Sequence, residues 1–206
     1  MHNKITKEDI KELPLKQFEG TVNVVEDPKQ VTHVVEKLRN EKIIGFDTET
    51  KPSFKKGVSH DVALLQLSTE EEAFLFRLNI TGFNGALTKL LSNPGIKKVG
   101  VGIRDDLRGL QQLNNFTPKG FIDIQELAPK YGIEVLSLKN LAGLLLGIRI
   151  SKRQRLSNWE ADALSEGQIL YAATDAWVAL KIYNKIKKMK PVASSPVKAD
   201  QKKKSS

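Results

Sequence analysis

The acidic pair Asp47 and Glu49 is the first feature of the chain that suggests chemistry. It follows the apolar run 43–46, which lacks helical spacing and so predicts a buried strand. Because side chains alternate along a strand, both carboxylates point to one face together with Gly45, while Thr48 points to the other. Two carboxylates at the end of a buried strand cost roughly several kcal/mol in lost hydration unless a cation or donors compensate. A strand that has already emerged into water would carry the same pair without any such function.

A second acidic position lies where another predicted strand passes into a helix. The strand 96–102 ends in glycine, and Asp105 and Asp106 fall in the first turn of the helix that follows. Acidic residues at a helix N-terminus interact favourably with the helix dipole, so either aspartate alone has a structural explanation.

A third acidic position, Asp175, lies in an otherwise apolar helical stretch. It follows Tyr171 by one helical turn, so the phenol and the carboxylate share a face. Its neighbours Ala172, Ala173 and Ala176 are small. Small residues around a buried carboxylate predict that another part of the molecule comes close to it.

Composition narrows the classes of protein. The chain has 206 residues, 40% of them hydrophobic, which predicts one well-buried core. There is no cysteine, so a metal must be held by oxygen or imidazole ligands. The N-terminus has no apolar leader, and no apolar run approaches membrane-spanning length. We therefore expect an intracellular, cytoplasmic protein without a membrane partner.

The net charge of +9 is unevenly distributed. Between Lys181 and Ser206 nine lysines face one aspartate, so this segment carries +8 and residues 1–180 carry only +1. Such an end is either an electrostatic tether for a polyanion or a solvated, solubilising tail.

The order of the predicted elements indicates a mixed α/β sheet in a single domain. Residues 1–19 predict a short helix and an extended segment, and Asp27 and Pro28 predict a helix start. We expect a domain over residues 1–190, whose motif-bearing part is about 20–190, and a disordered basic tail over 191–206. The predicted strands are 20–25, 43–50, 62–68, 72–78, 96–102 and 120–124; the predicted helices are 28–38, 87–91, 104–113, 125–131, 136–146 and 166–188.

Three motifs in this order resemble the DEDD superfamily of 3′ to 5′ exonucleases, in its tyrosine-bearing (DEDDy) branch. They are Phe46–Glu49, Gly100–Ile103 leading to Asp106, and Tyr171–Asp175. The segment Leu156–Trp159 is similar to Werner-type members of the branch, which also includes ribonuclease D. The family spacing favours Asp106 over Asp105.

The resemblance implies a ribonuclease H-like fold with a five-stranded mixed sheet flanked by helices. It also implies two divalent cations, Mg²⁺ or Mn²⁺, which suit carboxylate ligands. In the mechanism that it implies, Asp47 bridges both ions, Glu49 and Asp175 complete the first site, Asp106 reaches the second site through water, and Tyr171 orients the attacking water. No histidine falls in a motif, so none is expected to be catalytic.

Substrate contacts are expected in two loops. Lys51, Phe54 and neighbouring lysines follow the acidic pair, and Arg153 and Arg155 belong to the basic run 149–155 before the last helix. The first two residues would meet a phosphate and the terminal base, and the arginines would form a phosphate-binding rim. Exposed, solvated loops have the same composition. Trp159 is expected to pack in the core.

The expected function is metal-dependent hydrolysis of nucleoside monophosphates from a nucleic acid with a free 3′ end, with DNA favoured over RNA. Two alternatives stay open. One is an RNA-processing exoribonuclease of ribonuclease D type, and the other is a catalytically silent nucleic-acid-binding scaffold.

Overall fold

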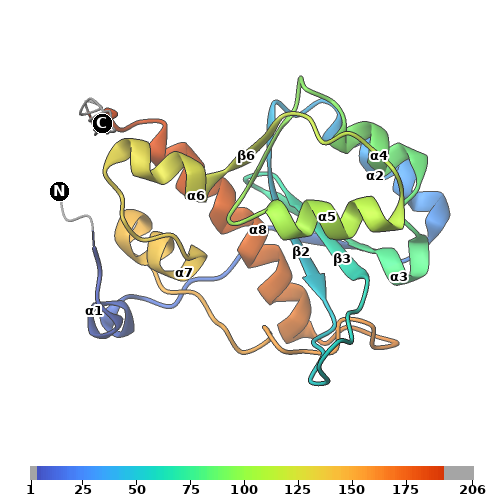
Figure 1. The fold of residues 1–206 in the computed structure, drawn as a ribbon, viewed down its shortest axis with the longest axis horizontal. Coiled ribbons are helices and arrows are strands. Elements are labelled where there is room, and N and C mark those ends of the chain that lie inside the picture. Colours follow the sequence, from blue (N-terminus) through green and yellow to red (C-terminus); the bar gives the residue numbers. More distant parts are fainter. Residues whose placement is uncertain (1–3, 193–206) are drawn as a thin grey trace, which may run out of the picture.

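The computed structural model describes residues 4–192 and contains a mixed sheet with helices on both faces (Figure 1). The sheet has six strands in the order β1-β4-β3-β2-β5-β6. The strands are β1 (Thr21–Val25), β2 (Ile43–Thr50), β3 (Val62–Ser68), β4 (Glu72–Arg77), β5 (Lys97–Gly100) and β6 (Phe121–Asp123). The longer helices are α2 (Pro28–Leu38), α4 (Gly85–Leu91), α5 (Arg104–Leu113) and α8 (Glu166–Ile186); the short ones are α1 (Lys7–Glu12), α3 (Leu78–Thr81), α6 (Ile124–Leu127) and α7 (Leu138–Leu141).

The sheet has six strands, as the residue patterns predict, and not the five that the family resemblance implied; the additional strand is β1, which was predicted at 20–25. It pairs in parallel with β4, from Thr21 opposite Glu72 to Val25 opposite Phe76. The β-branched sequence of β1 suits this position. The pairing also covers an edge of β4 that would otherwise leave backbone groups of a strongly apolar strand without partners.

Strand β2 lies in the middle of the sheet, antiparallel to β3 and parallel to β5. Its side chains alternate as expected. Ile44 and Phe46 pack with residues of α2, α4 and α5 on one face, while Gly45 faces α8 on the other. Figure 1 shows α2, α3 and α4 grouped at one end of the molecule and α1, α6 and α7 at the other, with α8 running between them.

Helix α8 packs directly against the sheet. Ser165 and Gln168 form a capping box at its start, and alanines form much of its buried surface. A Cβ added to Gly45 would lie 2.0 Å from the carbonyl oxygen of Ala176. The small residues of α8 therefore allow β2 to pack close to the helix, and Gly45 lets the two backbones come into contact.

The predicted helices 125–131 and 136–146 are each less regular than expected. The first is α6 followed by a 3₁₀ turn over Ala128–Tyr131, which contains Pro129. The second is α7 followed by a π-helical turn over Ala142–Leu146. Proline removes a helical donor, which explains the change of hydrogen bonding in the first of them.

The N-terminal segment is a short helix and an extended stretch, as predicted. Thr6 caps α1 in a capping box with Asp9. The chain then passes alongside Arg149, where the backbone nitrogen of Lys16 donates to the Arg149 carbonyl at 3.0 Å. The backbone nitrogen of Phe18 donates to Oγ1 of Thr174 in α8, also at 3.0 Å.

Most of the predicted basic tail lies outside the described residues, which end at 192. Within residues 4–192, none of the helices combines the length and the apolar character needed to cross a bilayer.

We predict that Gly45→Ala destabilises the protein by about 1–3 kcal/mol or more, because the new methyl group overlaps the Ala176 carbonyl and forces α8 away from β2. Gly85→Ala is the matched control, since a Cβ there meets no atom within 4 Å. It should leave the free energy of unfolding unchanged or raise it by up to about 1 kcal/mol. Urea denaturation of both proteins measures the difference, and equal stability of the two variants would contradict the close contact.

Candidate active site

Three of the predicted site residues come together where β2 meets α8. Asp47 and Glu49 project from the α8-facing side of β2, and Asp175 projects from α8 toward them. Each offers a carboxylate oxygen, and these three oxygens lie within 4.8 Å of one another. Asp175 follows Asp47 by 128 positions in the chain. The structure thus brings residues that are distant in sequence into one group small enough to hold a metal ion.

Asp106 approaches the same end of β2 from the opposite face of the sheet. The Oγ1 hydroxyl of Thr48 donates a short hydrogen bond to its carboxylate. Its neighbour Asp105 instead pairs with Arg108 at 3.0 Å and has a side chain that is 87% exposed. The geometry therefore favours Asp106 as the member of the acidic group, and places it beside the three-carboxylate cluster rather than within it.

Burial raises the pKa of every carboxylate in this group, and repulsion within the group adds to the effect for Asp47 and Glu49. Desolvation is the largest cause for each of them. The pKa of Glu49 rises to about 9, with the charges of Asp175 and Asp106 adding to the effect. The pKa of Asp47 rises well above its ordinary value for the same reasons, together with repulsion by Glu49. Because they are shielded from water, these carboxyl groups hold protons more tightly than exposed carboxyl groups do.

Asp175 is affected less strongly because two groups favour its ionised form. Burial raises its pKa to about 7, while the Tyr171 hydroxyl, as a hydrogen-bond donor, and the Lys152 ammonium lower it. The pKa of Tyr171 itself is raised by burial and by the charges of Asp175 and Glu49. The phenol therefore stays protonated at neutral pH and can act as a donor.

The donor set suits a hard divalent cation. It consists only of carboxylate oxygens, which Mg²⁺ and Mn²⁺ prefer. Oδ1 of Asp175 is buried and has no hydrogen-bond partner among the described residues. A cation among these oxygens would supply the missing partner and offset the repulsion that raises the pKa values.

Two hollows meet at Tyr171 and Asp175. One, of about 290 Å³, lies over Asp47 and Glu49 and extends to Leu138 of α7. The other, of about 470 Å³, lies between α8, the N-terminal segment and the basic run that includes Arg153. Tyr171 and Asp175 are thus accessible from two sides.

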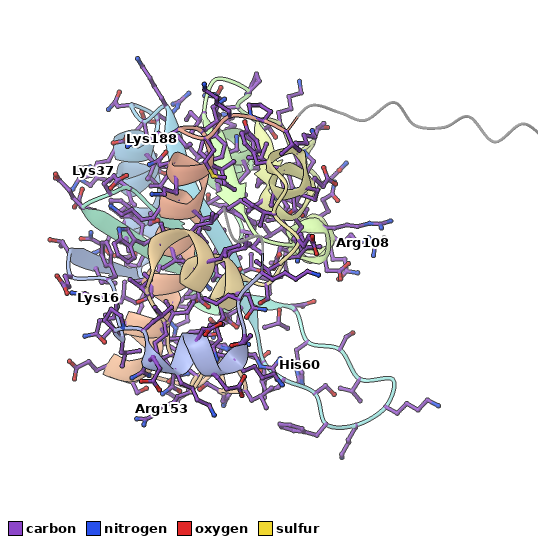
Figure 2. The ribbon with its side chains drawn as sticks, turned by 90° about the vertical axis from the view of Figure 1, so that its left-hand side faces the viewer. Lys16, Lys37, His60, Arg108, Arg153 and Lys188 are labelled. Carbon is purple, nitrogen blue, oxygen red and sulfur yellow. The ribbon has the colours of Figure 1, made fainter. Side chains whose placement is uncertain are left out.

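The residues predicted to contact substrate do not come together in one place, unlike the carboxylates. Lys51 forms an ion pair with Glu160 at 3.0 Å, and Phe54 is 83% exposed in the loop between β2 and β3. Figure 2 shows this loop extending away from the body of the protein near His60. Arg153 lines the larger hollow, whereas Arg155 is exposed outside its lining. Trp159 is fully buried and lies 6.0 Å from the Tyr171 ring, which confirms its packing role.

Sequence reasoning missed two residues that position the acidic group. Thr48 holds Asp106, and Asp123 at the end of β6 accepts hydrogen bonds from the backbone nitrogens of Gly102 and Ile103, at 2.9 and 3.0 Å. The second contact fixes the turn that leads into α5. Alternation along β2 placed Thr48 on the face opposite Asp47 and Glu49. That its partner would be Asp106 could not be predicted, because this contact depends on how α5 packs against the sheet.

Gln66 is a third residue that sequence reasoning missed. It is fully buried opposite Asp47 in the β2–β3 pairing, and neither of its amide atoms has a partner among the described residues. Directly opposed residues on antiparallel strands share a face, so Gln66 lies on the carboxylate side of the sheet. A single glutamine within the apolar run 62–67 was the available sequence signal.

This arrangement defines a class: an α/β protein with an acidic, metal-suited site at the end of a central strand. A family model described as a 3'-5' exonuclease matches residues 22–190. Over 184 residues the chain is 33% identical to the mouse protein "Bifunctional 3'-5' exonuclease/ATP-dependent helicase WRN". The aligned region covers 84% of this chain and 13% of the mouse protein. The chain is also 33% identical over 159 residues to Ribonuclease D of Gluconacetobacter diazotrophicus, covering 75% of this chain and 39% of that one.

Solved structures show the same fold. The Nibbler EXO domain of Aedes aegypti superposes with a TM-score of 0.75 at 24% identity, covering 84% of this chain and 91% of that domain. Escherichia coli RNase D superposes with a TM-score of 0.72 at 24% identity, covering 81% of this chain and 44% of that one. The fold is therefore ribonuclease H-like, as expected.

The chain belongs to the 3'-5' exonuclease family. It spans only a minor part of the two relatives described above, 13% and 39% of their lengths.

We predict that the metal-free protein loses stability as pH rises from about 5 to 9. Because the carboxyl pKa values are raised in the folded state, the folded protein holds more protons than the unfolded chain between the ordinary carboxyl pKa of about 4 and the Glu49 value of about 9. Its free energy of unfolding must therefore fall as pH rises through this window. Denaturant unfolding in chelator across that range measures the slope.

Glu49→Gln should make this slope shallower, and Glu41→Gln, which changes an exposed carboxylate, should leave it as in the wild type. Added Mg²⁺ or Mn²⁺ should stabilise the wild type more at pH 9 than at pH 6, because fewer protons must then be displaced. A wild-type stability that is flat or increasing over this range would show that the carboxylates are not crowded as described.

Proposed function

We propose that the protein is a metal-dependent 3′ to 5′ exonuclease that hydrolyses the terminal phosphodiester of a nucleic acid and releases nucleoside monophosphates. Membership of the 3'-5' exonuclease family supports the reaction. The single observation in the structure that supports it most strongly is the group formed by Asp47, Glu49 and Asp175 within 4.8 Å, at the meeting point of two hollows.

The same residues would hold the metal. Asp47, Glu49 and Asp175 form one ligand set, and Asp106, held by Thr48, lies where it can extend the set to a second ion. When bound, two divalent ions lower the pKa of a water nucleophile and stabilise charge on the leaving oxygen. We propose the two-ion arrangement for this chain on the strength of these four carboxylates.

The chain's own groups would orient the water. The Tyr171 phenol remains protonated and lies one helical turn from Asp175, so it can donate a hydrogen bond to a water or phosphate oxygen at the site. Burial of the carboxylates keeps their field strong, since a low local dielectric increases each electrostatic interaction.

The experiment is the product pattern from 5′-labelled oligonucleotides in Mg²⁺, Mn²⁺ and chelator. The proposal predicts a ladder that shortens from the 3′ end and disappears in chelator. Asp47→Asn and Asp175→Asn should lower the rate by about a hundredfold or more while the variants still bind the oligonucleotide. Binding without any ladder in the wild type, with either ion, would instead support the silent scaffold.

Asp105 and Asp106 provide a matched pair within this experiment. Asp106→Asn should lower kcat strongly, because it removes a carboxylate of the proposed ligand set. Asp105→Asn changes an exposed residue of the same type at the next position and should leave the rate within about twofold. Equal effects of the two substitutions would contradict the assignment of Asp106.

Matched single-stranded DNA and RNA in the same assay test the preference for DNA. Ribonuclease D, one of the relatives, is named for RNA, so processing of RNA is the second candidate function. A faster rate on RNA would replace DNA with RNA as the substrate and would leave the proposed chemistry unchanged.

A further inference from the structure

Gln66 of β3 is a fully buried polar side chain to which the site described above gives no role. Its relative exposure is 0%, and neither its amide oxygen nor its amide nitrogen has a hydrogen-bond partner within residues 4–192. A buried polar atom without a partner costs free energy, because the hydration lost on burial is not replaced. Two such atoms on one side chain therefore indicate that the amide pairs with another group when the protein works.

The sheet places Asp47 directly opposite Gln66. The two residues are Cα partners in the antiparallel pairing of β2 with β3, so their side chains share the face that α8 covers (Figure 1). On the other side of Gln66 its partner across the sheet is Leu75 of β4. Of its two cross-strand neighbours, Asp47 is therefore the one that can accept a hydrogen bond.

The surroundings of Gln66 along this face are largely apolar. Leu64, two residues before Gln66 on β3, and Leu75 pack in one buried cluster with Trp159. The Trp159 indole nitrogen is a donor only, so it cannot accept from the amide nitrogen of Gln66. The carboxylate of Asp47 is a stronger acceptor than a neutral group, because a charged acceptor forms the shorter and stronger bond.

A glutamine at this position can reach the carboxylate. Cβ atoms of directly opposed residues on antiparallel strands lie about 4.5–5.5 Å apart. Gln66 has three side-chain torsions, and rotation about them can bring its amide nitrogen within hydrogen-bond distance of an Asp47 oxygen. Oδ1 of Asp47 accepts a bond from the backbone nitrogen of Thr48 at 3.0 Å. A carboxylate can accept about four hydrogen bonds, so this contact leaves room for the amide.

We propose that Gln66 is a positioning residue for the metal site: its amide nitrogen donates to the Asp47 carboxylate and orients that carboxylate toward the cation. The inference rests on the metal site of the proposed exonuclease function. Carboxylates that bind a metal are themselves held by hydrogen bonds, and loss of such an outer partner weakens metal binding about 10–100-fold. Gln66 thus acts through Asp47 and contacts neither metal nor substrate.

The test compares affinity for Mn²⁺ with the stability of the metal-free protein. The variant is Gln66→Met, because methionine is unbranched, apolar and able to fill an irregular space. The matched control is Ser68→Ala. Ser68 is also fully buried with an unpartnered hydroxyl, on the same strand and the same face, but it lies opposite Gly45 and not opposite a carboxylate. Isothermal titration calorimetry with Mn²⁺ at pH 8 measures affinity, and urea unfolding in chelator measures stability.

Gln66→Met should bind Mn²⁺ about tenfold more weakly than the wild type, because Asp47 loses its outer partner. Its urea midpoint should stay the same or rise, since apolar atoms replace polar atoms that have no partner. Ser68→Ala should likewise keep or raise the midpoint, but should bind Mn²⁺ within about twofold of the wild type. Damage to packing would lower stability as well, so weaker metal binding without a loss of stability identifies a positioning role.

The failures of the two proposals are distinguishable. If Gln66→Met binds Mn²⁺ as tightly as the wild type, the role of Gln66 is wrong and the metal site stands. If it binds more weakly but its urea midpoint falls too, or if Ser68→Ala loses as much affinity, the loss comes from packing and the role is again wrong. Gln66→Leu takes the place of Gln66→Met if that variant does not fold. A wild type that binds no Mn²⁺ would overturn the proposed metal site and the role of Gln66 together.

Discussion

The site depends on the contact between Gly45 of β2 and Ala176 of α8. Only a residue without a side chain lets the Ala176 carbonyl approach so closely, because a Cβ would lie 2.0 Å from it. Gly45 precedes Asp47 by two residues on the same face of the strand, and Ala176 follows Asp175 directly. One close contact between backbones therefore sets the separation of the carboxylates, and the capped, alanine-rich helix keeps that separation fixed.

The same contact makes the site unfavourable for the protein alone. Carboxylates brought this close and shielded from water repel one another, which is why their pKa values rise. The fold tolerates this because the surrounding core is extensive, with apolar residues packed on both faces of the sheet. Strain of this kind at a functional site, balanced by packing elsewhere, is typical of groups prepared to bind a ligand that relieves it.

Local rules predicted most of the fold. Alternation along β2 placed Gly45, Asp47 and Glu49 on one face, and Asp27 with Pro28 marked the start of α2, where the aspartate side chain accepts a hydrogen bond from the backbone nitrogen of Lys29 at 2.9 Å. The count of five strands implied by the resemblance was wrong, although the residue pattern did predict β1; its place beside β4 was not predicted, because that pairing joins strands that are distant in sequence. The acidic residues were found because three motifs stood in a recognisable order.

Thr48, Gln66 and Asp123 were missed because their roles depend on which element packs across from them. The larger hollow beside Asp175 was missed for the same reason, since its walls at Lys16 and Arg149 meet only through tertiary contacts.

The account's central claim is that α8 and β2 together build a divalent-metal site. Electron paramagnetic resonance of Mn²⁺ titrated into the protein at pH 8 tests it most directly, because free Mn²⁺ is distinguished from bound Mn²⁺ without any need for substrate. The account predicts saturable binding in the wild type that is strongly weakened in Asp175→Asn and unchanged in Asp105→Asn. The claim would be contradicted if the wild type did not bind Mn²⁺, or if Asp175→Asn bound it as tightly as the wild type does.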